Sequence, residues 1–187
     1  MKRVIVILAD GFEQSEALVP HDMLKRAGAY VSTVSLGNKK EAVSTHGVKV
    51  ATDLCLDELP QADKIDLLVL PGGMPGASNI MNSEQVCSLA RDIFERGGIV
   101  SAICAAPFVL GRLGLLEGRH ATCYPGFENE LKGAIVSDTS RGGKVVRDGN
   151  VITASGMGVA LKFGAELVTA LYDKNTSDRI LKGIMCE

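Results

Sequence analysis

The chain has 187 residues, of which 46% are hydrophobic and 22% charged, and it contains 21 glycines. This size and composition predict one domain, spanning residues 1–187, with a sizeable core and many turns. A formal net charge of -2 at pH 7 and an aromatic content of 4%, without tryptophan, disfavour nucleic acids and anionic membranes as partners.

The first apolar run follows a short basic start, Met1-Lys2-Arg3. This run, residues 4–9, is shorter than the apolar core of a signal peptide, and it ends at Asp10-Gly11 without a cleavage pattern. We interpret it as the first buried strand of a cytoplasmic protein. No later segment has the length and hydrophobicity that a membrane-spanning helix needs.

Strand and helix patterns alternate along the rest of the chain. Strands are expected at residues 29–36, 66–70, 99–103, 144–147 and 151–154, and helices at residues 13–28, 82–97, 107–114, 156–171 and 176–185. The apolar run at 66–70 is typical of a strand in the middle of a parallel sheet. The alternation therefore predicts a mostly parallel sheet with helices on both faces.

Three further segments have weaker patterns. Residues 42–51 indicate a small hairpin at the sheet edge, and residues 54–59 indicate a short connection. Regularity fades between residues 119 and 136, where Tyr124-Pro125-Gly126 predicts a turn. We expect this last segment to reach over the functional site.

The cysteines predict neither a disulfide framework nor a zinc site. There are five, an odd number, and no Cys-x-x-Cys or histidine-rich spacing occurs among them. They are Cys55, Cys87, Cys104, Cys123 and Cys186. Reduced thiols in a cytosolic compartment are the simplest interpretation.

Cys104 lies at an unusual position, between the strand expected at 99–103 and the small residues Ala105 and Ala106 that precede a helix with Pro107 near its first turn. Such a strand-to-helix corner is typical of a nucleophile elbow, and the helix N-terminus is expected to lower the pKa of the thiol from its free value of about 8.5. Cys104 is therefore either a reactive thiolate or a small buried hydrophobic residue.

The ends of three strands carry carboxylates, a glycine pair and this thiol. These residues are Glu13 and Glu16 after the first strand, Gly72 and Gly73 after the strand at 66–70, and Cys104. If the strands are neighbours, the edge combines a nucleophile, a proton-handling group and free backbone amides. Which glutamate points inward stays open, and the glycine pair has the alternative meaning of a turn that needs positive φ.

Other polar side chains carry no distinguishing signal. None of the histidines, which are His21, His46 and His120, has a flanking sequence that assigns it to Cys104. The sequence therefore predicts no Cys-His dyad. Cys123 and Tyr124 are candidates too, but the sequence favours a structural role for each of them.

Three segments together carry a family resemblance. They are Leu8-Ala9-Asp10-Gly11-Phe12-Glu13-Gln14-Ser15-Glu16, Val69-Leu70-Pro71-Gly72-Gly73 and Ala102-Ile103-Cys104-Ala105-Ala106-Pro107. In this order they resemble the ThiJ/PfpI superfamily, in its parkinsonism-protein (DJ-one) branch. The similarity extends from Val4 to about Tyr172 and includes Ser155-Gly156-Met157-Gly158.

The resemblance implies a flavodoxin-like α/β three-layer sandwich, usually a homodimer, that works without cofactor or metal. It implies that Cys104 is the elbow nucleophile and that Glu16 hydrogen-bonds the thiol. Gly72, Gly73 and Ala105 match the backbone donors around the sulfur. Members of this branch are described as glutathione-independent glyoxalases, deglycases, chaperones and oxidation sensors.

Two positions depart from the family pattern. The protease-like branch has histidine directly after the cysteine, whereas this chain has Ala105, which argues against a peptidase. Many branch members have a histidine before a proline near the pocket, whereas this chain has Tyr124 before Pro125. Phenol is a poorer base than imidazole near neutral pH, so a mechanism that needs this histidine is in doubt.

Two hypotheses of different classes follow. In the first, the protein is an enzyme for small α-oxoaldehydes such as methylglyoxal, with Cys104 and Glu16 as catalytic residues and Glu13, Tyr124 and Pro125 near the pocket. In the second, it is a redox-sensing or chaperone-like stress protein whose Cys104 is oxidised to sulfinic acid.

Overall fold

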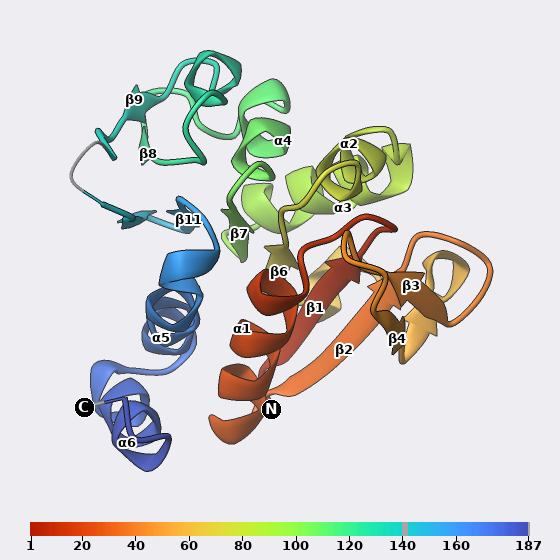
Figure 1. The fold of residues 1–187 in the computed structure, drawn as a ribbon, viewed down its shortest axis with the longest axis horizontal. Helices are drawn as coiled ribbons and strands as arrows, with labels where there is room; N and C mark the ends of the chain where they lie inside the picture. The colour runs from red at the N-terminus through yellow and green to blue at the C-terminus, as the bar shows by residue number, and fades with distance from the viewer. Residues whose placement is uncertain (140–141, 187) are drawn as a thin grey trace.

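The computed structural model describes residues 1–139 and 142–186, and over these residues the central sheet has seven strands in the order β10-β11-β7-β6-β1-β2-β5 (Figure 1). The strands are β1 (Arg3–Leu8), β2 (Tyr30–Ser35), β5 (Leu54–Cys55), β6 (Leu67–Leu70), β7 (Ile99–Ile103), β10 (Val145–Asp148) and β11 (Val151–Ala154). The helices are α1 (Gln14–Arg26), α2 (Gly76–Met81), α3 (Glu84–Glu95), α4 (Pro107–Arg112), α5 (Ala160–Leu171) and α6 (Lys174–Gly183).

The two faces of the sheet form two separate cores. Alternate residues of a strand point to opposite faces, so that Val4 and Val6 of β1 pack toward α1 and α5, whereas Ile5 and Ile7 pack toward α3 and α4. Figure 1 shows the two helical groups on either side of the sheet. The predicted three-layer α/β sandwich with a mostly parallel sheet is therefore confirmed.

Parallel pairing places the carboxyl ends of β1, β6 and β7 at one edge of the sheet. β6 lies between β1 and β7 and is parallel to both, with Val69 in register with Val6 on one side and with Ser101 on the other. The segments that follow these strands are therefore neighbours in space. The site predicted from the strand ends requires that these three strands are neighbours, and they are.

The hairpin predicted at residues 42–51 is confirmed, whereas the prediction of a connection at residues 54–59 was wrong. The hairpin of β3 (Glu41–Val43) and β4 (Lys49–Ala51) forms a small sheet of its own instead of extending the central one. The central sheet ends instead at β5, within the segment expected to be a connection, where two residues pair with β2. A two-residue strand is too short to show a periodic pattern.

The segment expected to be irregular contains short elements. β8 (His120–Ala121) and β9 (Ile135–Val136) pair in parallel, with a 3-10 turn between them at Glu128–Glu130. Further 3-10 turns are at Leu56–Glu58, Ala62–Lys64 and Met157–Val159.

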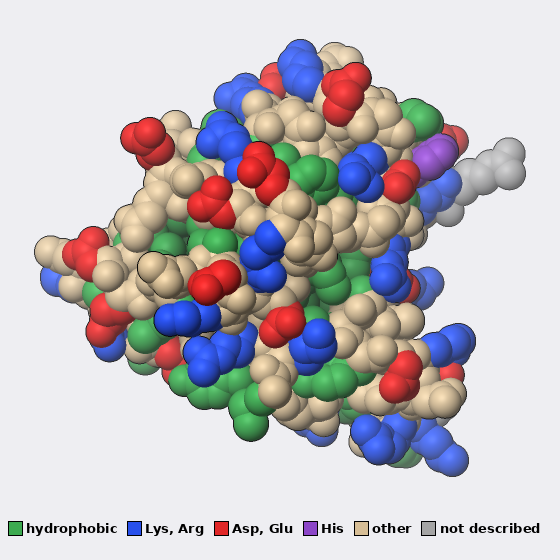
Figure 2. All heavy atoms as spheres, turned by 180° about the vertical axis from the view of Figure 1, so that it is seen from behind, with side chains coloured by type: hydrophobic (Ala, Val, Ile, Leu, Met, Phe, Trp, Pro, Cys, Tyr) green, Lys and Arg blue, Asp and Glu red, His purple; other side chains and the backbone are tan. Residues whose placement is uncertain are grey.

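Charged side chains of both signs are interspersed over the face that Figure 2 presents, with hydrophobic side chains in small groups between them. This distribution agrees with the formal net charge of -2. Among residues 1–139 and 142–186, no helix has the length and apolar character to cross a membrane.

Candidate active site

Cys104 occupies the turn between β7 and α4 with a positive φ of 65°. A residue with a Cβ atom adopts this conformation at a cost of about 1–2 kcal/mol, so surrounding contacts must hold it. The Cys104 N–H donates to the carbonyl oxygen of Ala154, and the Cys104 carbonyl accepts from the Tyr124 N–H, both at 2.8 Å. The backbone is thus held from both sides, and the side chain is half-buried.

Glu16 is the glutamate that points inward. It lies in the first turn of α1 with only 1% of its surface exposed. The Gly72 N–H donates to Glu16 Oε2 at 3.1 Å, and the Cys104 thiol and the Met157 amide approach the same carboxyl group. Oε1 is buried and has no hydrogen-bond partner among the described residues. One carboxyl oxygen is therefore oriented and the other is free.

Burial raises the pKa of Glu16 to about 7. The interaction with the Cys104 thiol lowers the pKa, the negative charge of Glu13 raises it, and the amides of Gly72 and Met157 lower it. Desolvation is the largest of these effects because the carboxylate loses its hydration without gaining a cationic partner among residues 1–139 and 142–186. The carboxyl group therefore changes its protonation state near neutral pH.

Burial also raises the pKa of the Cys104 thiol, to about 12, and the charge and hydrogen bonding of Glu16 raise it further. The amides of Ala105 and Gly73 act in the opposite direction. The predicted lowering by the helix N-terminus was wrong, because α4 has only six residues and its small dipole is outweighed by desolvation and by a neighbouring acid. The thiol and the carboxyl titrate as a coupled pair.

The predicted backbone donors divide into two groups. The amides of Gly73 and Ala105 approach the sulfur, whereas the Gly72 amide binds Glu16. A Cβ atom at Gly72 would lie 2.6 Å from both Cys104 Cβ and Glu16 Oε2, and one at Gly73 would lie 2.5 Å from the Glu13 nitrogen. Only glycine at these two positions lets the loop lie this close to Cys104, Glu16 and the Glu13 backbone, and Gly73 also has a positive φ of 88°.

Glu13 and the Tyr124-Pro125 turn lie around this pair. Glu13 caps α1, because its Oε2 accepts the Glu16 N–H at 2.8 Å. Tyr124 is 51% exposed, and its ring lies beside Gly156. Pro125 lines a cavity on the same side. The segment expected to reach over the site therefore contacts Cys104 through Tyr124.

Sequence reasoning assigned no role to two groups of this site, the Ala154 carbonyl and the Met157 amide. Both belong to the segment from β11 to α5, in which Ser155-Gly156-Met157-Gly158 was noted only as part of the resemblance. None of the three histidines is among the groups that shift the pKa of Glu16 or Cys104 within the described residues. These residues also contain no cluster of three or more side chains able to hold a metal ion.

Comparison with known proteins identifies the family to which the chain belongs. The model of the DJ-1/PfpI family matches residues 2–170. The chain belongs to this family. Drosophila melanogaster DJ-1beta is 34% identical over 186 residues, covering 98% of this chain and 97% of the relative. Its crystal structure matches with a TM-score of 0.89. The family resemblance inferred from the three motifs is thereby confirmed.

Two further members of the DJ-1/PfpI family are informative. A Pyrococcus abyssi protein named a deglycase is 35% identical over 154 residues, which cover 81% of this chain and 89% of the relative. The structure titled Toxoplasma gondii DJ-1, oxidized, has 29% identity and a TM-score of 0.91, covering 99% of this chain and 98% of that one.

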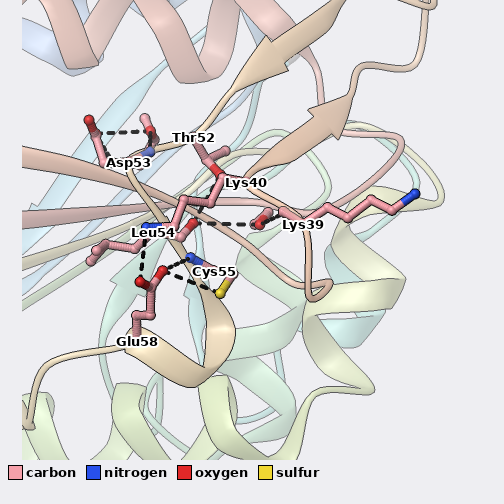
Figure 3. A network of polar contacts seen from close by, with 9 residues as sticks. Lys39, Lys40, Thr52, Asp53, Leu54, Cys55 and Glu58 are labelled. Carbon is pink, nitrogen blue, oxygen red and sulfur yellow. Dashed lines mark hydrogen bonds and ion pairs between the residues drawn. The ribbon is translucent and has the colours of Figure 1, made fainter.

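The chain has a second contact between a thiol and a carboxylate, which shows by comparison why the pKa of Glu16 is raised. Cys55 Sγ lies 3.3 Å from Glu58 Oε2, and Lys40 Nζ lies 2.9 Å from Glu58 Oε1 (Figure 3). The hydrogen bond from Lys40 lowers the pKa of Glu58 to about 2, whereas burial raises that of Glu16 to about 7. Burial without a cationic partner among the described residues, and not the contact with a thiol, gives Glu16 its proton near neutral pH.

Proposed function

We propose that this DJ-1/PfpI-family protein is a glutathione-independent enzyme of the glyoxalase or deglycase type, which converts methylglyoxal and similar α-oxoaldehydes to 2-hydroxy acids. The observation that supports it most is the buried Glu16 carboxyl, with one free oxygen, beside the Cys104 sulfur. One relative is named a deglycase, which agrees with an enzymatic role.

In the first step, the sulfur of Cys104 attacks the aldehyde carbon of methylglyoxal. The thiol retains its proton at neutral pH because its pKa is raised to about 12, so the Glu16 carboxylate accepts this proton while the sulfur-carbon bond forms. Glu16 then passes this proton to the aldehyde oxygen, which restores the carboxylate and gives a hemithioacetal. The active pair therefore carries a single proton before the attack.

In the second step, Glu16 moves a proton between the two substrate carbons. Its free Oε1 removes the proton from the hemithioacetal carbon and delivers it to the adjacent carbonyl carbon, while the proton of the hemithioacetal hydroxyl passes to the carbonyl oxygen. This isomerisation converts the hemithioacetal into a thioester of lactate without net oxidation. Water then hydrolyses the thioester, which releases lactate and restores the thiol.

The backbone groups around the pair have separate roles in this proposal. The amides of Gly73 and Ala105, which approach the sulfur, stabilise negative charge that develops on the substrate oxygen. The Gly72 amide, at 3.1 Å from Oε2, instead fixes the orientation of the acid. Gly72 is thus a positioning residue in the reaction, and not a direct donor to the substrate.

The test is lactate formation from methylglyoxal in the absence of glutathione. Cys104→Ala should abolish activity, and Glu16→Gln should lower kcat by about 10²–10⁴-fold, the contribution expected of a positioned acid-base group. Lys39→Ala, a change of an exposed lysine on the loop before β3, is the control. Activity that survives both site substitutions contradicts the mechanism.

A redox-sensing role is the second candidate, favoured by the Glu16 carboxyl beside Cys104, which titrates near pH 7 and as a carboxylate can accept the thiol proton while the sulfur attacks peroxide. A structure of a relative is titled oxidized. Mild peroxide should then add two oxygens to Cys104 before the other cysteines, as measured by mass spectrometry. Indiscriminate oxidation of all five cysteines contradicts this role.

Family membership also supports a homodimer as the working assembly. Light scattering of the purified protein should give twice the mass of one chain. A mass equal to that of a single chain at micromolar concentration contradicts the dimer.

A further inference from the structure

We propose that the aromatic ring of Tyr124 is a specificity-determining wall of the Cys104 site. It favours α-oxoaldehydes with an apolar or aromatic substituent over those with a small one. This inference rests on the proposed function, since it names the class of substrate that the same site takes.

The position of the ring follows from two short contacts. The Tyr124 N–H donates to the Cys104 carbonyl at 2.8 Å, which ties residue 124 to the nucleophile. A Cβ atom placed at Gly156 would lie 3.4 Å from Tyr124 Cδ2 and 4.0 Å from Cys104 Sγ. The ring and the sulfur therefore face the same small space, which Gly156 leaves open because it has no side chain.

A cavity continues from this space. Its volume is about 420 Å³, and Pro125, Met157 and Val159 are among the described residues that line it beside Tyr124. A cavity of about 150 Å³ lined by apolar side chains is large enough to bind benzene. Tyr124 and Gly156 lie beside the sulfur and also line this cavity, so a phenyl substituent placed in it would contact the Tyr124 ring while the aldehyde carbon reaches the sulfur.

The ring, and not the hydroxyl group, is the part of Tyr124 that the structure holds in place. Its backbone is fixed by Cys104 and its ring edge lies against Gly156. The hydroxyl group has no hydrogen-bond partner in the described part of the chain that would orient it for proton transfer. Aromatic rings also favour offset or edge contacts with other rings, so an aryl substituent gains most from this wall.

The test compares kcat/KM for phenylglyoxal and methylglyoxal. Tyr124→Ala should lower the ratio of these two values about tenfold, a typical effect of losing one apolar contact in a specificity pocket. Tyr124→Phe retains the ring and should retain the wild-type ratio. Tyr30→Ala, a change of a 54% exposed tyrosine at the amino end of β2, is the control and should alter neither value.

Two results overturn the inference: a ratio that is unchanged in Tyr124→Ala, or one that falls equally in Tyr124→Phe. Absence of 2-hydroxy acid from both aldehydes with the wild-type protein refutes the proposed function instead. A second measurement, which requires no turnover, distinguishes failure of the inference about Tyr124 from failure of the proposed function.

This second measurement is the alkylation of Cys104, followed by mass spectrometry. The sulfur displaces chloride from 2-chloroacetophenone, which has an aryl ketone, and iodide from iodoacetamide, which is small and polar; the thiol proton leaves to the carboxyl or to water. The ratio of the two rates should fall about tenfold in Tyr124→Ala and stay unchanged in Tyr124→Phe. A ratio that is equal in all three proteins refutes the apolar wall even if glyoxals are converted.

Discussion

The Glu13 carboxylate accepts the backbone N–H of Glu16 at 2.8 Å, so one acid caps the helix that holds the other acid in the site. The same proximity gives Glu13 an electrostatic effect, because its negative charge raises the pKa of Glu16. Glu13 therefore influences both the position and the protonation state of Glu16, the candidate catalytic acid.

Glu13→Gln should shift the acid side of the pH-rate profile to lower pH. Removing the negative charge lowers the pKa of Glu16, so the carboxylate that accepts the thiol proton forms at a lower pH. The measurement is kcat/KM against pH for methylglyoxal, with a wild-type midpoint near the Glu16 pKa of about 7. Glu13→Asp retains the charge and is the control. A midpoint that moves upward contradicts this effect.

Glu16→Gln should make the protein more stable at pH 8 while inactivating it. The folded protein holds the Glu16 proton up to pH about 7, whereas the unfolded chain releases it near 4.5. Wild-type stability therefore falls as pH rises between these values and stays lower above pH 7. At about 1.4 kcal/mol per pH unit, the ionised carboxyl costs roughly 3 kcal/mol.

Urea unfolding at pH 4 and pH 8 measures this difference. The gain in unfolding free energy of Glu16→Gln should be largest at pH 8 and disappear below pH 4.5. Glu95→Gln, which changes an exposed residue at the end of α3, is the matched control and should show no such pH dependence. A gain of equal size at both pH values excludes Glu16 as the titrating group.

Gly72→Ala should disrupt the site more than a comparable change nearby. The added methyl group would lie 2.6 Å from Cys104 Cβ and from Glu16 Oε2, and 2.7 Å from the Ile103 carbonyl oxygen. Because the backbone must move, we expect the free energy of unfolding to fall by about 1–3 kcal/mol. We also expect most of the activity to be lost. Gly158→Ala is the control, since no atom lies within 4 Å of its Cβ position. Equal effects of both changes refute the steric argument.

Glu58→Gln should make Cys55 more reactive. The hydrogen bond to Glu58 raises the pKa of the Cys55 thiol, so its loss increases the thiolate fraction at pH 8. The rate of iodoacetamide labelling at Cys55, relative to the exposed Cys186, measures this change by mass spectrometry. Slower labelling of Cys55 in the variant contradicts the assignment of the hydrogen bond.

Much of the fold was predictable because long-range order follows from strong local patterns. The apolar run of β6 predicted a central strand, and the helix cap at Ser83 marked the start of α3, where its hydroxyl oxygen accepts the Val86 N–H. The two residues of β5 and the six of α2 gave no comparable signal. Short elements form because tertiary contacts support them, and single-sequence patterns do not contain those contacts.

The site was predictable in its residues but not in its electrostatics. The positions of Cys104 and Glu16 followed from the strand ends and the resemblance. The direction of the shift in the thiol pKa did not, because it depends on how deeply the pair is buried and on the charge of Glu16 beside the thiol. Likewise, only coordinates show that the Gly72 amide binds Glu16 instead of facing the sulfur.

The pairing of Cys104 with Ala154 has a consequence for synthesis of the protein. Glu16 lies in α1, whereas Gly72, Cys104 and Ala154 lie at or just after the ends of β6, β7 and β11. The hydrogen bond between Gly72 and Glu16 alone spans 56 positions in the chain. Such distant contacts form late in folding, since long loops must close first. A nascent chain that has not yet emerged beyond β11 therefore carries Cys104 without its hydrogen bond to Ala154, and the candidate site is complete only when the whole sheet has assembled.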